Sequence, residues 1–489
     1  MAALALDGAA AAPRGDYPLA IVNLEQTALR AAPRDGAQQQ AQLAAGDVVE
    51  IRGERLNYLQ VYDHRRERAG FVRADRLHRT ELAPAEMPAL LAVLRHLRDQ
   101  PGQEALGIAY AAAWLKAAAP AQLAGSDAQH AFEALGTLAD RLAERATRGQ
   151  AAGRPGEAAA AAQLETAAAL GVEFASFQRG DRMQICYTGD AWKRLLATGA
   201  SGAQRAAAAL ALSRAECSGD DLGVSERARL TEARASLLDG VDTDELPAYF
   251  KNRIALRRAA LWSSVAFDRA RAAQSTAGAA AERALAELAT VVKTELPDED
   301  LPAYNDAAMR VNAVRWAAAA PAAVPAVPAG LAVVAAPGQA PGETCVTLID
   351  AARGASAPLT QRCTFGLVWT ASAASDRKGN ALALAVQPLD GWRELWIFQV
   401  RDGKWGVDVL PPAASGPELG YAEFAGWSPD GRQLLVAREA RSEGKYRRSF
   451  EVLRADTLTP ERQSSDPSSL GAFQRWQDAA WKRASVALR

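Results

Sequence analysis

The stretch that decides the fold reads Ala20-Ile21-Val22, Leu29-Arg30-Ala31-Ala32-Pro33, Leu43-Ala44-Ala45-Gly46-Asp47-Val48-Val49-Glu50-Ile51, Tyr58-Leu59-Gln60-Val61, Gly70-Phe71-Val72 and Leu77. Short β-rich runs alternate here with turn residues, which is typical of small antiparallel strands. Gly46 and Asp47 lie directly before an alternating run, where the chain has to turn. Gly70 lies where two strands pack closely, because a side chain would interfere there. Residues 18–80 therefore predict one small β-barrel.

This stretch resembles the bacterial SH3 domain family. Residues 29–33 match an L-R-x-x-P opening, residues 43–49 an L-x-x-G-x-x-V turn, and residues 70–72 a G-[WF]-V closing strand. The resemblance implies a barrel that binds cell-wall peptides or serves as a scaffold, mostly in exported proteins. The candidate binding residues in the barrel are Tyr58, Tyr62 and Phe71, and Tyr58 stands where many members have Trp. The alternative is a purely structural barrel with Tyr58 and Phe71 in its core.

The bulk composition favours a globular protein of about three domains. The net charge of −1 gives no electrostatic reason to expect nucleic acid or an anionic membrane as a partner. No run of residues approaches the roughly 18 apolar residues that a membrane span needs. Residues 1–17 predict a flexible tether of the kind that follows a cleaved signal peptide, which favours a periplasmic or otherwise exported protein, and a cytoplasmic location is the alternative.

The four cysteines fall into two local pairs, Cys186 with Cys217 and Cys345 with Cys363. The first pair flanks a predicted helical hairpin, and the second lies in two consecutive strand-like runs. Neither a C-x-x-C motif nor a histidine at ligand spacing accompanies them, so the sequence predicts no zinc site. Two disulfides, each contributing about 3 kcal/mol, would place the chain in an oxidising compartment. The alternative is four buried free thiols.

Two helical regions follow the barrel. In residues 86–146, Leu90, Leu91, Leu94 and Leu97 recur at helical spacing, and Ser126 is a plausible helix start. Residues 147–155 predict a linker. Residues 156–320 are rich in alanine and predict a second, repeat-like helical domain.

This second helical domain contains one internal repeat. Asp244-Glu-Leu-Pro-Ala-Tyr249 is followed by Trp262, and Glu299-Asp-Leu-Pro-Ala-Tyr304 by Trp316. Acidic residues before a proline make a favourable helix start, so each copy predicts a helix with an aromatic near its beginning. Stacked helical hairpins with a concave peptide-binding surface are one interpretation, with Tyr249 and Tyr304 as binding candidates. The other is that these aromatics form the core between helices.

A Pro/Ala linker is predicted at residues 321–341, and an antiparallel β domain at residues 342–489. The strand candidates are residues 345–350, 363–369, 381–386, 394–400, 405–410, 421–427, 433–438 and 449–454. The turn Ser428-Pro-Asp-Gly431 resembles the hairpin of TolB-like and WD40-like propeller blades. Eight strands suffice for about two blades, whereas a propeller needs at least four, so a sheet or sandwich of blade-like hairpins is expected. Trp476 and Trp481 are expected to pack on this sheet.

Catalytic motifs are missing from the sequence. The four histidines show no metal-binding spacing, and no P-loop, G-x-G-x-x-G or G-x-S-x-G motif occurs. Acidic clusters at residues 220–221 and 298–300 could supply the paired carboxylates of a glycosidase, but both lie at apparent helix starts, where helix capping explains them. The sequence therefore predicts no cofactor, no metal and no catalytic residue.

Together these features predict a multidomain α+β protein with an SH3-like β-barrel, a helical repeat-like middle and an antiparallel β domain. The favoured function is a non-enzymatic, exported binding or scaffold protein of the bacterial cell envelope. Its expected partner is a protein or a cell-wall peptide, and its oligomeric state is left open. The alternatives are a cell-wall-active hydrolase with an SH3-like targeting module, and a subunit of a larger periplasmic assembly.

Overall fold

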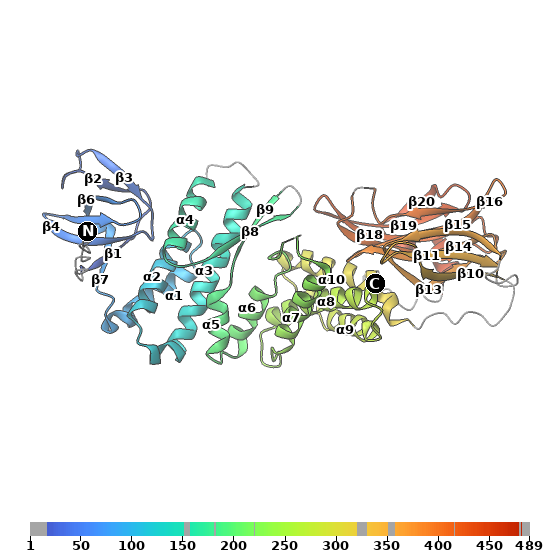
Figure 1. The fold of residues 1–489 in the computed structure, drawn as a ribbon, viewed down its shortest axis with the longest axis horizontal. Coiled ribbons are helices and arrows are strands. Elements are labelled where there is room, and N and C mark those ends of the chain that lie inside the picture. Colours follow the sequence, from blue (N-terminus) through green and yellow to red (C-terminus); the bar gives the residue numbers. More distant parts are fainter. Residues whose placement is uncertain are drawn as a thin grey trace, which may run out of the picture. The chain divides into compact units, whose positions relative to one another are not determined.

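The computed structural model describes residues 17–150, 157–179, 182–219, 221–319, 330–350, 357–414, 416–478 and 481. The chain divides into two compact units, Met1–Leu222 and Gly223–Arg489. Both units contain helices and antiparallel strands, as expected for a multidomain α+β protein (Figure 1). Residues 1–16 of the predicted tether and residues 151–155 and 321–329 of the predicted linkers lie outside the described residues.

The first unit begins with a seven-stranded antiparallel sheet in the order β3-β2-β6-β5-β4-β1-β7. Its strands are β1 (Leu19–Val22), β2 (Thr27–Arg30), β3 (Gln39–Leu43), β4 (Val48–Arg55), β5 (Tyr58–Asp63), β6 (Arg68–Arg73) and β7 (Leu77–Thr80), with the 3-10 turn η1 (Ala74–Arg76) before β7. The sheet encloses an apolar core made of Ala20, Val22, Leu29, Leu43, Val49, Ile51, Leu59, Val61, Val72 and Leu77. The β-rich runs of residues 20–77 thus form strands around one interior.

Two glycines of this sheet have the roles that the sequence predicts. Gly46 turns the chain before β4 with a φ of +91°, a conformation that side chains rarely adopt. A Cβ atom at Gly46 would also lie 2.5 Å from the carbonyl oxygen of Ala105, because the turn packs directly on a helix of the same unit. At Gly70, a Cβ atom would lie 2.8 Å from the side chain of Leu29 on β2.

Three helices follow the sheet in the first unit. They are α1 (Met87–Arg98), α2 (Glu104–Ala117) and α3 (Ser126–Gln150), preceded by the 3-10 turns η2 (Pro84–Glu86) before α1 and η3 (Pro120–Ala124) before α3. Helix α2 packs on β1. Along α3, the buried residues Ala128, Phe132, Leu135 and Leu142 recur at steps of four, three and seven residues, which makes one apolar face. Ile21 and Ala45 of the sheet region belong to the same core, so sheet and helices are joined by apolar packing.

The predominantly helical region predicted at residues 156–320 also contains a pair of strands that was not predicted. After α4 (Glu157–Ala169) come the paired strands β8 (Phe174–Arg179) and β9 (Arg182–Tyr187), then α5 (Asp190–Ala197) and α6 (Gly202–Leu212). The strands form because Ile185 packs into a small core with Ala143, Ala146 and Ala160, a tertiary contact that helical propensity does not reveal. The predicted domain is also divided by the boundary between the two units.

The second unit starts with two helical hairpins. Their helices are α7 (Val224–Asp239), α8 (Ala248–Arg271), α9 (Ala277–Ala289) and α10 (Leu301–Val314), with the 3-10 turns η4 (Lys293–Glu295), η5 (Asp298–Asp300) and η6 (Arg315–Ala318). Small and branched residues of α8, α9 and α10 pack together in one core, among them Leu256, Ala284 and Val311. The two copies of the internal repeat start α8 and α10, as expected from their prolines.

Two sheets complete the second unit. The first contains β10 (Leu331–Pro337), β11 (Thr344–Asp350) and β12 (Pro358–Thr364), and the second contains β13 (Leu367–Ser375), β14 (Ala381–Leu389), β15 (Trp392–Arg401), β16 (Lys404–Leu410), β17 (Leu419–Trp427), β18 (Gln433–Ser442), β19 (Lys445–Arg454) and β20 (Pro460–Ser464). Leu348 of β11 shares a core with Leu384 and Phe398 of the second sheet, so the sheets pack face to face.

Three features of these sheets differ from the sequence prediction. Strand β10 lies in the predicted linker 321–341, because Val333 and Val334 pair with β11 despite the surrounding proline and alanine. The predicted strand at residues 363–369 is divided, since Gly366 lies against the backbone of Pro388 where the chain passes from one sheet to the other. Strands β15 and β17 pair in parallel, whereas only antiparallel pairing was expected.

The end of the second unit agrees with the sequence prediction. Trp476 and Trp481 pack against a core of sheet residues that includes Leu435 and Phe450, next to η7 (Pro467–Ser469) and α11 (Gly471–Arg475). In the predicted turn, Gly431 has a φ of +71° and Ser428 Oγ accepts a hydrogen bond of 2.9 Å from the backbone N–H of Gln433. The Ser428 hydroxyl thus stabilises the turn.

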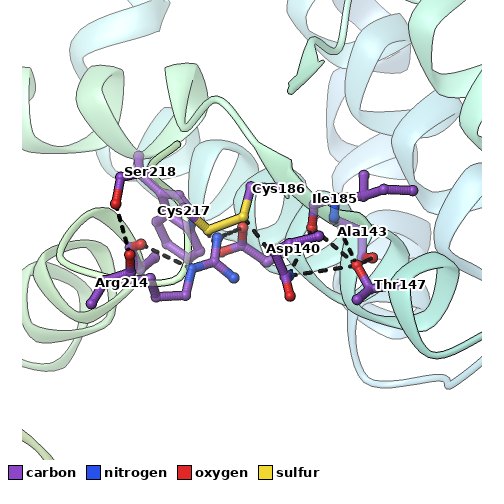
Figure 2. Close-up of a disulfide and its surroundings, with 12 residues drawn as sticks. Asp140, Ala143, Thr147, Ile185, Cys186, Arg214, Cys217 and Ser218 are labelled. Carbon is purple, nitrogen blue, oxygen red and sulfur yellow. Dashed lines mark hydrogen bonds and ion pairs between the residues drawn. A yellow bond between two sulfur atoms is a disulfide. The ribbon is translucent and has the colours of Figure 1, made fainter. Parts of the chain in front are cut away.

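Both predicted cysteine pairs form disulfides in the structure. Cys186 at the end of β9 is bonded to Cys217, so the bond encloses the hairpin of α5 and α6 (Figure 2). Cys345 on β11 lies opposite Cys363 on β12 and is bonded to it. These two bonds suggest an oxidising environment.

Candidate functional site

A cleft of about 330 Å³ in the first unit lies between the seven-stranded sheet and helix α4. Three segments line it, namely the turn before β4, the turn between β5 and β6, and the end of α4. The lining residues are Gly46, Asp47, Val48, Asp63, His64, Arg65, Thr166, Ala169 and Leu170. This volume lies at the lower end of the range of small-molecule and peptide pockets.

Asp47 connects the sheet to α4 through a hydrogen bond at the base of the cleft. Its carboxylate is only 5% exposed and accepts hydrogen bonds from the Thr166 hydroxyl at 2.9 Å and from the backbone N–H of Ala44 at 3.0 Å. Arg66 Nη1 lies 2.9 Å from Asp47 Oδ2, the oxygen that also accepts the hydrogen bond from Ala44. A buried charge of this kind is tolerated because each oxygen has partners, so Asp47 serves to position the walls of the cleft.

Asp63 shapes the turn that carries the charged wall of the cleft. It accepts hydrogen bonds from the backbone N–H groups of Arg65 at 3.0 Å and Arg66 at 3.3 Å, and its other oxygen lies 2.6 Å from Arg66 Nη1. Arg65 then reaches across to α4, where its Nη1 donates to Thr166 Oγ1 at 3.0 Å. The Arg65 guanidinium is therefore held at the cleft while its side chain remains 27% exposed.

An aromatic and charged group borders the cleft on the outer face of β4 and β5. Arg52 lies 3.9 Å above the ring of Tyr62, and the His64 ring meets the edge of the same tyrosine at 4.8 Å. Glu50 contacts both side chains, with Arg52 Nε at 2.8 Å and His64 Nε2 at 2.7 Å. The hydrogen bond from Arg52 lowers the pKa of Glu50, and the hydrogen bond from His64 acts in the same direction.

The chemistry of the cleft suits a ligand with two kinds of groups. Arg65 and His64 provide hydrogen-bond donors for a carboxylate or a carbonyl oxygen. Val48, Ala169 and Leu170 provide an apolar wall on which small alkyl groups can lie. This combination is suited to binding a ligand that carries both kinds of group.

The candidate aromatics of the sheet are not equivalent in the structure. Tyr58 is 3% exposed and its hydroxyl donates to Asp35, so it belongs to the interior. Phe71 is half-buried on β6, opposite Gln60 and Arg30. Tyr62, also half-buried, lies beside the cleft because its neighbours Asp63 and His64 line it.

The aromatics of the internal repeat do not line one surface. Trp262 and Tyr304 pack against the core between α8, α9 and α10, as the alternative interpretation predicts. Tyr249 is 45% exposed at the start of α8. Trp316 lies in η6, next to a cavity of about 90 Å³ in the same unit.

That small cavity adjoins a buried charge cluster in the second unit. Glu423, 5% exposed, pairs with the fully buried Arg393 and with Arg315, whose Nη2 lies 2.7 Å away. Burial lowers the pKa of Arg393 to about 10, so it remains a cation at neutral pH. The indole N–H groups of Trp316 and Trp481, which both line the cavity, have no hydrogen-bond partner among the described residues. A few ordered waters would satisfy them.

The acidic clusters considered for catalysis have structural surroundings. Glu299 and Asp300 bind the guanidinium of Arg253 at the start of α10. Asp220 lies outside the described residues, so the other cluster is described only at Asp221. Within the described segments, one group of potential metal ligands comes together, Glu343 with Cys345 and Cys363, but both sulfurs are committed to a disulfide.

The cleft was not found in the sequence because its walls come from distant segments. Asp47 and Thr166 are in contact although more than a hundred residues separate them in the sequence, and no local sequence pattern predicts that contact. The charged run Asp63-His64-Arg65-Arg66 was a usable signal, since it stands in a short turn directly after a β strand.

Comparisons of the chain with protein-family models, with curated proteins and with solved structures found no match. Among the described residues, no helix is long and apolar enough to cross a membrane. The function therefore has to be inferred from the residues of the chain itself.

Asp268 on α8 provides a test of the electrostatics of the second unit. Burial, followed by the negative charge of Asp390, raises its pKa from 3.8 to about 6, against the opposing charges of Arg271 and Arg227. The folded state thus holds a proton that the unfolded state releases, and stability falls as the pH rises from about 4 to about 6. We expect Asp268→Asn to stabilise the protein at pH 7.5 by about 1–2 kcal/mol, allowing for partial exposure of the carboxyl.

The gain should largely vanish at pH 3.5, where Asp268 is mostly protonated in both states. Thermal unfolding of both proteins at the two pH values measures this difference. An equal shift in melting temperature at both pH values would show that the side chain acts through packing instead of charge.

Proposed function

We propose that this protein is a non-enzymatic, exported binding or scaffold protein of the bacterial cell envelope. The observation that carries the proposal is the cleft of about 330 Å³ beside Tyr62, with a charged wall and an apolar wall. The two disulfides support a location outside the reducing cytoplasm, with the periplasm as the proposed compartment. The proposed partner is a protein segment or a cell-wall peptide.

The resemblance of residues 18–80 to bacterial SH3 domains is part of this proposal. The short strands around one apolar core, the turn at Gly46 and the close packing at Gly70 support it. The ligand would lie between the barrel and α4, with its carboxylate at Arg65 and His64. Small side chains such as alanine, which are common in cell-wall peptides, would contact Val48 and Leu170.

The proposal also includes the resemblance of the second sheet to propeller blades. Strands β13 to β16 form one antiparallel meander and β17 to β20 another, and the parallel contact of β15 with β17 joins them. Two four-stranded meanders support the proposed likeness to propeller hairpins, without a closed ring. In this view the second unit presents a surface for assembly with other proteins.

Filling the cleft should abolish ligand binding. Ala169 lines the cleft and is exposed, so Ala169→Trp places an indole in the space without disturbing the core. Ala168 is the adjacent exposed residue of α4 and does not line the cleft, which makes Ala168→Trp the matched control. With a soluble cell-wall tetrapeptide as probe, we expect at least about tenfold weaker binding for Ala169→Trp and unchanged binding for Ala168→Trp, measured by isothermal titration calorimetry.

Two outcomes would contradict the proposal. If the wild-type chain does not bind the tetrapeptide or purified peptidoglycan, the cleft is not a cell-wall site. If both tryptophan variants bind like the wild type, the ligand lies elsewhere. Mass spectrometry of the same incubations separates binding from hydrolysis, because cleavage products would favour the hydrolase alternative.

A further inference from the structure

The disulfide between Cys345 and Cys363 joins two strands of the second unit that are also paired along their backbones. The two cysteines stand directly opposite each other in the ladder of β11 and β12, and the ladder continues on both sides of them. Cys363 is exposed, whereas Cys345 is 8% exposed. In the other disulfide Cys186 is buried and Cys217 half-buried. Because thiol–disulfide exchange requires access of the attacking thiolate, the bond at Cys363 is the more reactive of the two.

The carboxylate of Glu343 lies beside both sulfur atoms of this bond. One of its oxygens and the two Sγ atoms all lie within 4.8 Å of one another. The turn before β11 orients the carboxylate, since Glu343 Oε2 accepts hydrogen bonds from the backbone N–H groups of Gln339 at 2.9 Å and Ala340 at 3.3 Å. A Cβ atom at Gly338 would collide with this carboxylate, so the glycine leaves room for it. These bonds leave lone pairs of the carboxylate for a further partner.

Reduction of the bond turns this group into a set of metal ligands. A dithiol supplies two electrons and two protons, so that its own sulfurs form a disulfide while the protein bond breaks and both cysteines become thiols. Side chains directly opposite each other in an antiparallel ladder keep their Cβ atoms about 4.5–5.5 Å apart, so both sulfurs stay close after the bond breaks. Two thiolates that bind Zn²⁺ at about 2.3 Å in tetrahedral geometry lie about 3.8 Å apart, which this spacing permits.

We propose that reduction of the Cys345–Cys363 disulfide by a dithiol creates a Zn²⁺ site, with the two Sγ atoms and the Glu343 carboxylate as protein ligands and water as the fourth ligand. Thiolate and carboxylate ligands in tetrahedral geometry suit zinc, and both thiols lose their protons as the metal binds. Exchange with a disulfide compound as the oxidant re-forms the bond and releases the ion. Disulfide and metal therefore exclude each other. The proposal goes beyond the peptide-binding function of the first unit and does not depend on it.

The first experiment identifies the disulfide that a dithiol reduces in the folded chain. The wild type is treated with limiting dithiothreitol, and the free thiols are alkylated and located by peptide mass spectrometry. We expect Cys345 and Cys363 to be labelled at least about tenfold faster than Cys186 and Cys217, because access limits the exchange. Equal labelling of both pairs, or faster labelling of Cys186 and Cys217, would overturn the selective reduction on which the proposal rests.

The second experiment titrates the full chain with Co²⁺, whose thiolate complexes are coloured, and then displaces it with Zn²⁺. A phosphine serves as the reductant here, because a dithiol would itself bind the metal. We expect one Co²⁺ per chain for the reduced wild type and none for the oxidised wild type. The matched control is Cys345→Ser/Cys363→Ser, which keeps Cys186, Cys217 and Glu343 and should bind no Co²⁺ after the same reduction.

Two further variants test the carboxylate ligand. Glu343→Gln should bind Co²⁺ at least about tenfold more weakly than the wild type, because an amide is a poorer ligand than a carboxylate. Asp402→Asn changes an exposed carboxylate in the turn between β15 and β16 and should bind Co²⁺ like the wild type. Thermal unfolding of each reduced variant shows whether it is folded. Absence of Co²⁺ binding by the reduced wild type, equal binding by the serine variant, or unchanged binding by Glu343→Gln would each overturn the proposal.

Discussion

Glu423→Ala is expected to destabilise the second unit by about 3–5 kcal/mol, the usual consequence of leaving a buried charge without its partner. Glu423 lies on β17 and neutralises Arg393 of β15, which is completely buried. After the substitution, the hydrogen-bond acceptors left to Arg393 among the described residues would be the backbone carbonyls of Asn312 and Ala313, at 2.7 and 3.3 Å. Two neutral acceptors do not compensate a cation that is removed from water.

The same cluster connects the helices to the sheet within the second unit. Arg315 follows α10 and approaches Glu423 from the helical side, while the carbonyls that receive Arg393 belong to the last turn of α10. Because these residues bridge helices and sheet, we expect Glu423→Ala to weaken the attachment of α10 as well as the sheet. Calorimetry of the full chain and urea unfolding followed by Trp fluorescence measure the decrease in the free energy of unfolding.

Two further variants separate charge from packing. Glu461→Ala, at an exposed position of β20, should change stability by less than about 0.5 kcal/mol. The doubly substituted Arg393→Met/Glu423→Leu chain removes the fully buried cation together with the carboxylate, so that Arg315 is the one arginine of the cluster that loses its contact with Glu423, and it should be more stable than Glu423→Ala alone. If the double variant is at least as unstable as the single one, the loss reflects cavity formation instead of the unpaired arginine.

This cluster also illustrates what the sequence could and could not predict. Residues 394–400 and 421–427 were predicted as strands because they are rich in aromatic and branched residues. Glu423 is a charged residue within the second run, and Arg393 directly precedes the first. Only the parallel contact of β15 with β17, which has no local sequence signal, places Arg393 opposite Tyr421 and near Glu423.

The errors in the fold have a similar origin. Local propensity favours helix in the alanine-rich region that contains β8 and β9, and favours an irregular linker for the Pro/Ala run that contains β10. In both cases pairing with a neighbouring strand and burial of Ile185 or Val333 outweighs the local preference. The cysteine pairs were predictable because each pair is close in sequence and lies in neighbouring elements.

Removal of the Cys186–Cys217 disulfide is expected to destabilise the first unit by about 3–4 kcal/mol. The bond joins residues that are 31 positions apart, and closing a loop of this length restricts the unfolded chain by about that amount. It holds the end of β9 next to the segment that follows α6, close to the ion pair of Arg214 with Asp140 (Figure 2). Asp140 also accepts a hydrogen bond from Trp192 Nε1 at 2.8 Å, so loss of the disulfide should loosen the packing of α5 on α3.

The experiment compares the wild type with Cys186→Ser/Cys217→Ser and with Cys345→Ser/Cys363→Ser. The second bond spans only 18 positions between strands that are already paired, so its removal should cost less. Thermal unfolding with and without reductant measures both effects, and reductant should lower the melting temperature of the wild type but not that of a variant lacking all four cysteines. Alkylation of the unreduced, denatured wild type followed by intact mass should find no free thiol. Four alkylated cysteines would instead show a reduced protein, and would remove the main support for a location outside the cytoplasm.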